Sequence, residues 1–199
     1  MLIIDNLFVI IAIIIVIIVF LKFGIVLTIL ILIFLIAFVN SPDKHYTEYK
    51  DDMFYCPSSG YVKSIDSNNG NLKISLFLNV FDNHTQYIPL KSRFISSDTI
   101  NGGFVPAFEE HSINNTRVIN KLYNQKYNFE YKITQITGLL TRRILTLAKT
   151  QNDFLPGDRL GFIILGSRVD IEIPIAKVKD IFVKKGKHIY AMEPLLSLI

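Results

Sequence analysis

The sequence has few of the residues on which many protein sites depend. Its 199 residues include a single cysteine, Cys56, so no disulfide can form within the chain and a cysteine-based metal cluster is excluded. The four histidines lie far apart and show no metal-ligand spacing, and no Gly-rich phosphate loop or dinucleotide fingerprint is present. The net charge of +4 is too small and too scattered to predict nucleic-acid binding, although it suits an anionic lipid surface. We therefore expect neither a metal nor a nucleic-acid partner.

Charge is nearly absent from the N-terminal part of the chain, where the apolar residues are concentrated. Between Leu7 and Val39 the only charged residue is Lys22. Two apolar runs, 7–21 and 25–39, flank Lys22-Phe23-Gly24. Each run is somewhat short for a straight transmembrane helix, which needs about 20 residues.

Two arrangements of these apolar runs compete. They form either a tight helical hairpin with Lys22-Phe23-Gly24 at its tip, or one long tilted helix. A glycine and a charge at mid-depth are costly in a single helix, which favours the hairpin. A secretory signal peptide fits poorly, because the first residues contain Asp5 but no Lys or Arg, and no small-residue cleavage site follows. We therefore expect residues 1–40 to anchor the chain in a membrane, with an orientation that the loop charges do not decide.

Residues 41–199 are typical of one compact β-rich domain. Short runs of β-branched and aromatic residues alternate with turn clusters. Ser67-Asn68-Asn69-Gly70 predicts a hairpin turn, because Asn-Gly tolerates positive φ, and Leu155-Pro156-Gly157-Asp158 predicts another. The segment 137–148 suits a short helix or a strand. The predicted strands are 60–65, 72–78, 128–136, 159–165, 169–173 and 178–183.

Four short segments contain residues suited to catalysis or binding. Asp82 and His84 follow a predicted strand, and a histidine can act as a general acid or base near neutral pH. Gly166-Ser167-Arg168 ends an apolar strand, and Ser59 lies in a turn that enters another. The pair Arg142-Arg143 suits a phosphate or a carboxylate. Taken alone, each segment also has a structural explanation, namely a surface histidine, a bulge, a turn or a salt bridge.

Taken in order, these segments resemble the phosphatidylserine decarboxylase family, in particular its short branch, over nearly the whole chain. Two matches are specific: residues 135–144 are similar to the family's QIAGLVARRI, and residues 157–174 are similar to GERFGFIRFGSRVDLYLP. Weaker matches occur at residues 40–43, 57–60, 74–89 and 115–117.

The resemblance implies that the chain cuts itself between Gly166 and Ser167. The Ser167 hydroxyl would attack the Gly166 carbonyl, and the serine would end as a pyruvoyl group at the start of the downstream chain. This cofactor, made from the chain itself, would decarboxylate phosphatidylserine to phosphatidylethanolamine. The family match assigns His84 as the base that takes the hydroxyl proton, and His84 is also a candidate to protonate the product.

The resemblance also implies an architecture and partners. The β-rich domain would be a lipoyl-like barrel-sandwich, preceded by the hydrophobic helical hairpin. The cleaved β chain (1–166) and α chain (167–199) would stay associated, and a homodimer is compatible with the family. Arg142, Arg143 and Arg168 are candidate contacts for the substrate phosphate, and membrane lipids are the expected surroundings.

Ser59 departs from the family pattern. The family has an aspartate at this position, which orients the histidine for self-cleavage. A serine hydroxyl can fix the histidine tautomer but hardly stabilises the imidazolium, and Asp82 is a candidate substitute. The alternative hypothesis is therefore an uncleaved, inactive lipid-binding relative, and a purely scaffolding β domain is a third.

Overall fold

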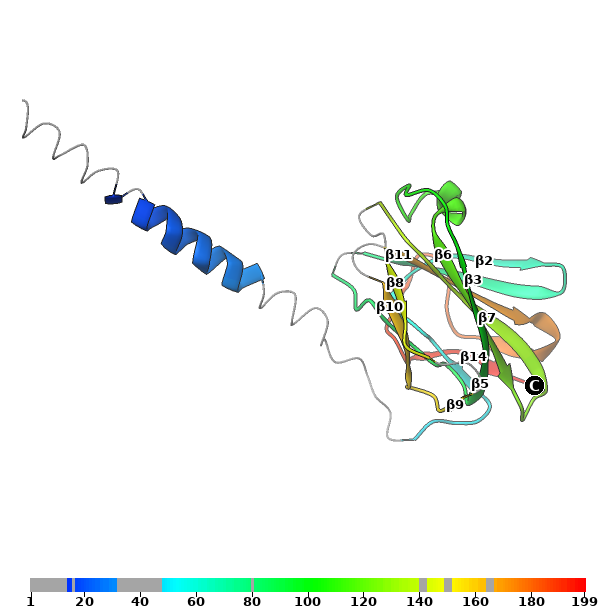
Figure 1. Ribbon diagram of the computed structural model, residues 1–199. Coiled ribbons are helices and arrows are strands. Elements are labelled where there is room, and N and C mark those ends of the chain that lie inside the picture. Colours follow the sequence, from blue (N-terminus) through cyan, green and yellow to red (C-terminus); the bar gives the residue numbers. More distant parts are fainter. Residues whose placement is uncertain are drawn as a thin grey trace, which may run out of the picture. The chain divides into compact units, whose positions relative to one another are not determined.

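The chain divides into two compact units, Met1–Asn40 and Ser41–Ile199 (Figure 1). The computed structural model describes residues 14–15, 17–31, 48–79, 81–139, 143–148, 152–163 and 167–199. Within these residues the first unit is helical and the second is mostly β, which confirms the predicted fold class at this level.

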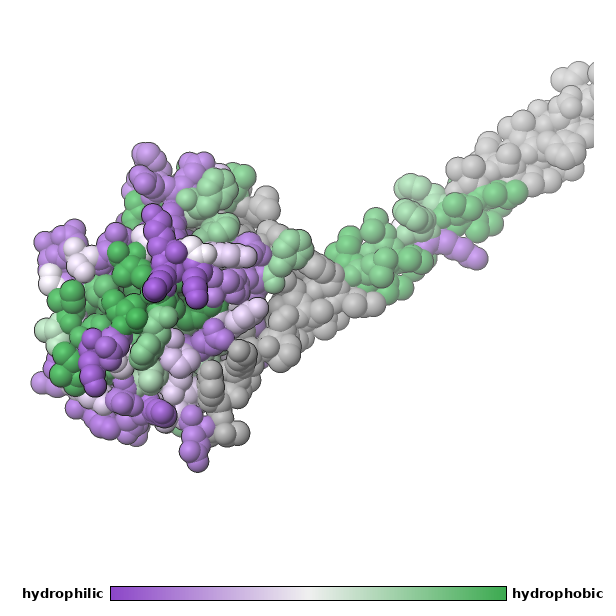
Figure 2. Space-filling view, turned by 180° about the vertical axis from the view of Figure 1, so that it is seen from behind, coloured by the Kyte–Doolittle hydropathy of each residue, from purple (hydrophilic) through white to green (hydrophobic). Residues whose placement is uncertain are grey.

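The N-terminal unit contains a helix that is continuous through residues 17–31. The predicted hairpin tip at Lys22-Phe23-Gly24 is therefore wrong, because these residues lie inside the helix. A glycine in a helix interior costs only about 1 kcal/mol, and the Thr28 hydroxyl donates to the Gly24 carbonyl at 2.8 Å. The described surface of this helix is almost entirely apolar (Figure 2). Among the described residues, no helix has the length and apolar character needed to cross a membrane.

In the second unit the described strands pair antiparallel into three sheets. The large sheet has the order β13-β2-β3-β11-β7-β6-β5-β9, and the small sheets are β1-β14-β12 and β4-β10-β8. Among these strands no closed barrel is seen. The elements are β1 (Met53–Tyr55), β2 (Gly60–Asn68), β3 (Asn71–Leu78), β4 (Thr85–Tyr87), β5 (Ser92–Ile100), η1 (Glu110–Asn114), β6 (Arg117–Asn124), β7 (Phe129–Ile136), β8 (Ile144–Thr146), β9 (Asp153–Phe154), β10 (Arg159–Ile163), β11 (Ser167–Pro174), η2 (Ile175–Lys177), β12 (Val178–Ile181), β13 (His188–Ile189) and β14 (Pro194–Leu198).

Both predicted turns are confirmed. Asn69 and Gly70 have φ values of 49° and 76°, which suits the tight turn between β2 and β3. In the second turn, Gly157 has a φ of 89° and the Asp158 amide donates to the Leu155 carbonyl at 3.2 Å. The described part of segment 137–148 contains a short strand, β8, in place of a helix.

The strand that begins at Ser167 lies in the middle of the large sheet. β11 pairs with β3 on one side and with β7 on the other (Figure 1). Because side chains alternate along a strand, Val169 and Ile171 point into the apolar core, whereas Arg168 and Asp170 point to the opposite face. Ser167 shares the core-facing side of the strand.

The apolar core joins the large sheet to the sheet that contains the C-terminal strand. Phe54 of β1 and Tyr131 of β7 meet edge to face, with their ring centroids 5.1 Å apart. Leu195 and Leu196 of β14 belong to the same buried cluster. The last strands of the chain are therefore packed against strands that precede Ser167.

Candidate active site

Ser167 is the first residue of β11 and is completely buried. It pairs with Leu78, the last residue of β3. Its hydroxyl oxygen is the one buried side-chain nitrogen or oxygen in the described part of the chain that has no hydrogen-bond partner. An orphaned buried hydroxyl normally costs free energy, and its presence needs an explanation, such as a catalytic role. Gly166, the residue predicted to precede the cut, lies outside the described residues.

His84 lies just before β4 and is also buried. Its Nδ1 is 2.6 Å from the backbone carbonyl oxygen of Asp82. A carbonyl only accepts, so Nδ1 carries the proton and Nε2 is the basic nitrogen. Burial lowers the pKa of His84 below its ordinary value, because desolvation disfavours imidazolium, and the carbonyl and charge of Asp82 oppose this lowering. His84 is thus a neutral base with a defined tautomer.

A chain of buried amides connects His84 to the strand beside Ser167. The Gln86 side chain donates to the His84 carbonyl at 2.8 Å, and its oxygen accepts from the Gln135 side chain at 2.7 Å. Gln135 on β7 is paired with Val169, two residues after Ser167. The Ile163 amide donates to the same His84 carbonyl at 3.1 Å. The backbone of His84 is therefore bound to β10, which ends just before the predicted cleavage position, and is linked through Gln86 to β7, which pairs with β11.

Ser59 and Asp82 are the two candidate partners of the histidine ring. The Ser59 hydroxyl accepts from the Ala191 amide at 2.9 Å. One oxygen of the Asp82 carboxylate is 2.7 Å from His188 Nε2, and the other accepts from the Asn79 amide at 2.8 Å. Asp82 thus orients His84 through its backbone carbonyl, while its carboxylate closes the turn from β3 and ties that turn to β13.

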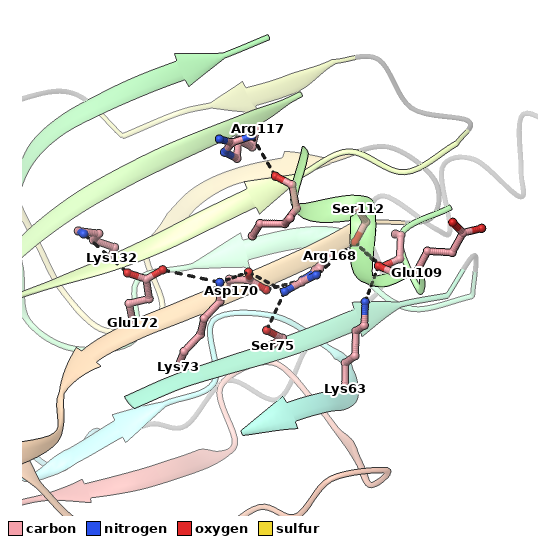
Figure 3. Close-up of polar contacts among 12 residues, drawn as sticks. Lys63, Lys73, Ser75, Glu109, Ser112, Arg117, Lys132, Arg168, Asp170 and Glu172 are labelled. Atoms are coloured by element: carbon pink, nitrogen blue, oxygen red, sulfur yellow. Dashed lines mark hydrogen bonds and ion pairs between the residues drawn. The ribbon is translucent and has the colours of Figure 1, made fainter. Parts of the chain in front are cut away.

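Arg168, a candidate phosphate contact, is buried on the far face of β11 from the core (Figure 3). Its guanidinium forms two bonds with the Asp170 carboxylate, at 2.6 and 3.0 Å, and donates to the Ser112 and Ser75 hydroxyls at 3.2 Å each. Lys73 lies 3.0 Å from the same carboxylate. The guanidinium donors of Arg168 are therefore bonded to groups within the protein, which favours a structural role over substrate binding.

Of the other two candidate arginines, the structure describes only Arg143. Arg143 is exposed and stands immediately before β8. Arg142 lies outside the described residues.

The sequence did not indicate His188, Gln86 or Gln135 as parts of the site. His188 is 106 residues from Asp82 in sequence, so no local pattern links them. The only available signal for the glutamines was their position in otherwise β-forming segments, because uncharged amides buried in a strand require partners.

The sequence of this chain is similar to those of one family of known proteins. Residues 34–197 match the family model described as phosphatidylserine decarboxylase. A putative archaetidylserine decarboxylase proenzyme of Methanococcoides burtonii is 29% identical over 164 residues, which is 82% of this chain and 74% of the relative. A phosphatidylserine decarboxylase proenzyme of Burkholderia ambifaria is 30% identical over 176 residues, or 84% of this chain and 80% of the relative.

A phosphatidylserine decarboxylase proenzyme of Streptomyces avermitilis is 33% identical over 138 residues, covering 69% of this chain and 62% of the relative. No solved structure matches the chain. The family model covers well over half of the residues, including the segments that contain Ser167 and His84. The chain belongs to the phosphatidylserine decarboxylase family.

Proposed function

We propose that this chain is a proenzyme that cuts its own Gly166–Ser167 bond and then decarboxylates the serine headgroup of an aminophospholipid, with phosphatidylserine as the substrate and phosphatidylethanolamine as the product. The observation that carries the proposal is the Ser167 hydroxyl, which is buried and has no partner among the described residues. Family membership supplies the reaction class.

In the proposed cleavage, His84 Nε2 accepts the hydroxyl proton as the Ser167 oxygen attacks the Gly166 carbonyl carbon. The peptide C–N bond breaks and the nitrogen takes a proton, so the amide becomes an ester. Loss of the Ser167 α-proton then expels residues 1–166 as a carboxylate and leaves dehydroalanine. Hydrolysis of this residue releases ammonia and leaves a pyruvoyl group at the start of residues 167–199.

The residues present fit a group formed at this position, because Ser167 is fully buried and its oxygen is not bound by a neighbour. When formed, the pyruvoyl group supplies a carbonyl that combines with the substrate amine and withdraws electrons as carbon dioxide leaves. Burial of the surrounding residues excludes water. His84 would then hold or return a proton at Nε2.

The strand pairing supports association of the two pieces after the cut. On the downstream side of the proposed cut, β11 is bonded to β3 and β7, β13 is bonded to β2, and β14 is bonded to β1. Each of these contacts joins residues 167–199 to residues that precede the cut. Separation would require unfolding of the large sheet.

The N-terminal unit supports a membrane location. The described helix exposes large apolar side chains over its whole length, including Phe20 and Phe23. We propose that Met1–Asn40 holds the chain at a lipid bilayer, where an aminophospholipid is available. Arg143, exposed before β8, is the described arginine that remains a candidate for the lipid phosphate.

Intact mass spectrometry of the full chain, expressed in membranes, tests the proposal. We expect two pieces, of which the smaller begins with a pyruvoyl group in place of Ser167. Purified protein should release carbon dioxide from phosphatidylserine. Archaetidylserine, which has the same headgroup, tests whether the lipid backbone is discriminated. A single chain with an intact Ser167 would overturn the proposal.

A second function is favoured by Ser59. Its hydroxyl is bonded to the Ala191 amide, and the nearby Asp82 carboxylate faces His188 instead of the His84 ring. A serine at this position supplies no negative charge to stabilise imidazolium, and the chain would then be an uncleaved lipid-binding relative. Ser59→Asp should start cleavage in that case, with Ser58→Asp, at the adjacent buried serine, as the matched control.

A further inference from the structure

The registers of the large sheet place three loops at one end of it. Ser167 pairs with Leu78, and Arg168 pairs with Ile136. Ile136 pairs in turn with Arg117, and Arg117 pairs with Ile100. The loops that follow β3, β5 and β7 therefore all leave the sheet where β11 begins, which we call the Ser167 end.

Each of these three loops exposes a large apolar side chain. Phe81 follows β3 and is 81% exposed, Phe108 lies between β5 and β6 and is 62% exposed, and Leu139 follows β7 and is 60% exposed. The Phe108 ring touches Phe77, whose strand partner is Arg168, with ring centroids 6.0 Å apart. We call Phe81, Phe108 and Leu139 the apolar rim.

The opposite end of the sheet, where β5 begins and β6 ends, has a different surface. A cavity of about 350 Å³ there has charged residues in its lining, among them Lys91, Arg93 and Lys126. Leu155, beside β9, is an exposed leucine at this end. A single exposed apolar side chain is ordinary, but three of them on loops at the same end of a sheet form a candidate interaction surface.

We propose that the apolar rim inserts into the interfacial layer of a lipid bilayer, so that the Ser167 end faces the lipids. This rests on the proposed function, because only a lipid substrate requires the site to face a membrane. Phenylalanine and leucine are favoured on the apolar side of such interfaces. The rim residues come from three separate loops and have exposed polar neighbours such as Glu109, which suits shallow insertion better than the continuous apolar patch of a stable dimer.

The exposed charges near the rim are of both signs. Glu109 and Glu110 precede or begin η1, and Arg143 precedes β8. Lys63 donates to the Glu109 carbonyl at 2.6 Å. Insertion would therefore depend on the apolar side chains more than on the charge of the lipid headgroups.

Lipid quenching in the full chain tests the proposal. Cys56 is fully buried, so Phe81→Cys and Leu139→Cys each add one reactive thiol for a bimane fluorophore. Leu155→Cys is the matched control, because Leu155 is about as exposed as Leu139 but lies at the opposite end. The labelled proteins are placed in phosphatidylcholine vesicles with or without brominated acyl chains.

We expect brominated lipid to quench labels 81 and 139 several-fold more than label 155. Equal quenching at all three positions would overturn the proposal. Labels shielded from aqueous iodide but not quenched by lipid would also overturn it, and would assign the rim to a second copy of the chain.

The same measurement in a Ser167→Ala background separates this proposal from the proposed function. If the rim labels are quenched but the wild type is never cleaved, the proposed decarboxylase function is refuted and the proposed membrane insertion of the rim is retained. Cleavage and decarboxylation without rim quenching would refute the membrane surface alone. In an active enzyme, Leu139→Asp should raise KM for vesicle substrate several-fold but not for a soluble short-chain lipid, and Leu155→Asp should change neither.

Discussion

Polar side chains form different kinds of interactions at the two ends of the large sheet. At the Ser167 end, His84, Gln86 and Gln135 are buried, and their hydrogen bonds include those to backbone carbonyls, between the two glutamines and to the Asn120 side chain. At the opposite end, the Arg93–Asp153 and Lys126–Asp51 ion pairs are exposed. Buried networks fix geometry and are costly to break, whereas exposed pairs are solvated and contribute little. A single polar substitution should therefore have unequal effects at the two ends.

The largest effect is expected from Ser167→Ala, which should abolish cleavage because it removes the nucleophile. Folding should not suffer, because an unpaired buried hydroxyl itself costs about 1–3 kcal/mol. Gel mobility and a denaturation midpoint measure the two outcomes. Ser92→Ala is the matched control at the other end. Ser92 is equally buried but bonded to Leu90 and Tyr131, so this variant should lose about 1 kcal/mol and still be cut. Cleavage of the Ser167 variant would refute its role.

Arg168→Met should have the next largest effect, on stability. It leaves the buried Asp170 carboxylate without its two guanidinium bonds, and breaking such a pair costs about 3–5 kcal/mol. Lys73, 3.0 Å from Asp170, remains as a partner and should hold the loss near the lower part of that range. Denaturant unfolding of the uncut Ser167→Ala background measures it. Unchanged stability there, together with a raised KM when Arg168→Met is made in the wild-type chain, would instead show that Arg168 binds substrate.

The strands β2, β3, β7 and β11 were predictable from sequence, and β5 and β6 were not. The β2–β3 turn contains Asn69-Gly70, and in β11 β-branched residues alternate with charged ones. In β6, by contrast, two of the four inward positions are Asn120 and Asn124. These asparagines are satisfied by distant carbonyls, those of Ile133 and Lys91. Their buried amides conceal the apolar alternation that identifies a strand.

The candidate site was predictable only in part. The resemblance indicated Ser167 and His84, and both are buried in the large sheet or beside it. The partner of the Asp82 carboxylate was not predictable, because His188 approaches it through the pairing of β13 with β2. The continuous helix at Lys22 was the less favoured of the two predicted arrangements, because the argument for a hairpin assumed a cost in the membrane, whereas local helix bonding tolerates Gly24.

A moderate effect is expected from pH. The ordinary pKa of histidine is about 6.5, and burial lowers the pKa of His84 in the folded state. The unfolded chain therefore binds the proton more readily, so the stability tied to neutral His84 is complete above pH ~6.5 and declines as pH falls from there toward the folded pKa. The loss of folding stability at acid pH should be smaller in His84→Gln than in the parent chain, when both carry Ser167→Ala. Because His84 stays neutral at lower pH, we also expect the wild type to keep its cleavage rate somewhat below pH ~6.5.

Asp153→Asn should have the smallest effect, because the Arg93–Asp153 pair is exposed on both sides. The ion pair lowers the pKa of Asp153 and raises that of Arg93, yet water replaces it when it is lost. We expect an unchanged denaturation midpoint at ordinary salt and an unchanged cleavage rate. Asp170→Asn is the control, because it makes the same change at a buried carboxylate on β11. This variant should be clearly destabilised. Comparable losses in the two variants would show that burial is not what separates the two ends.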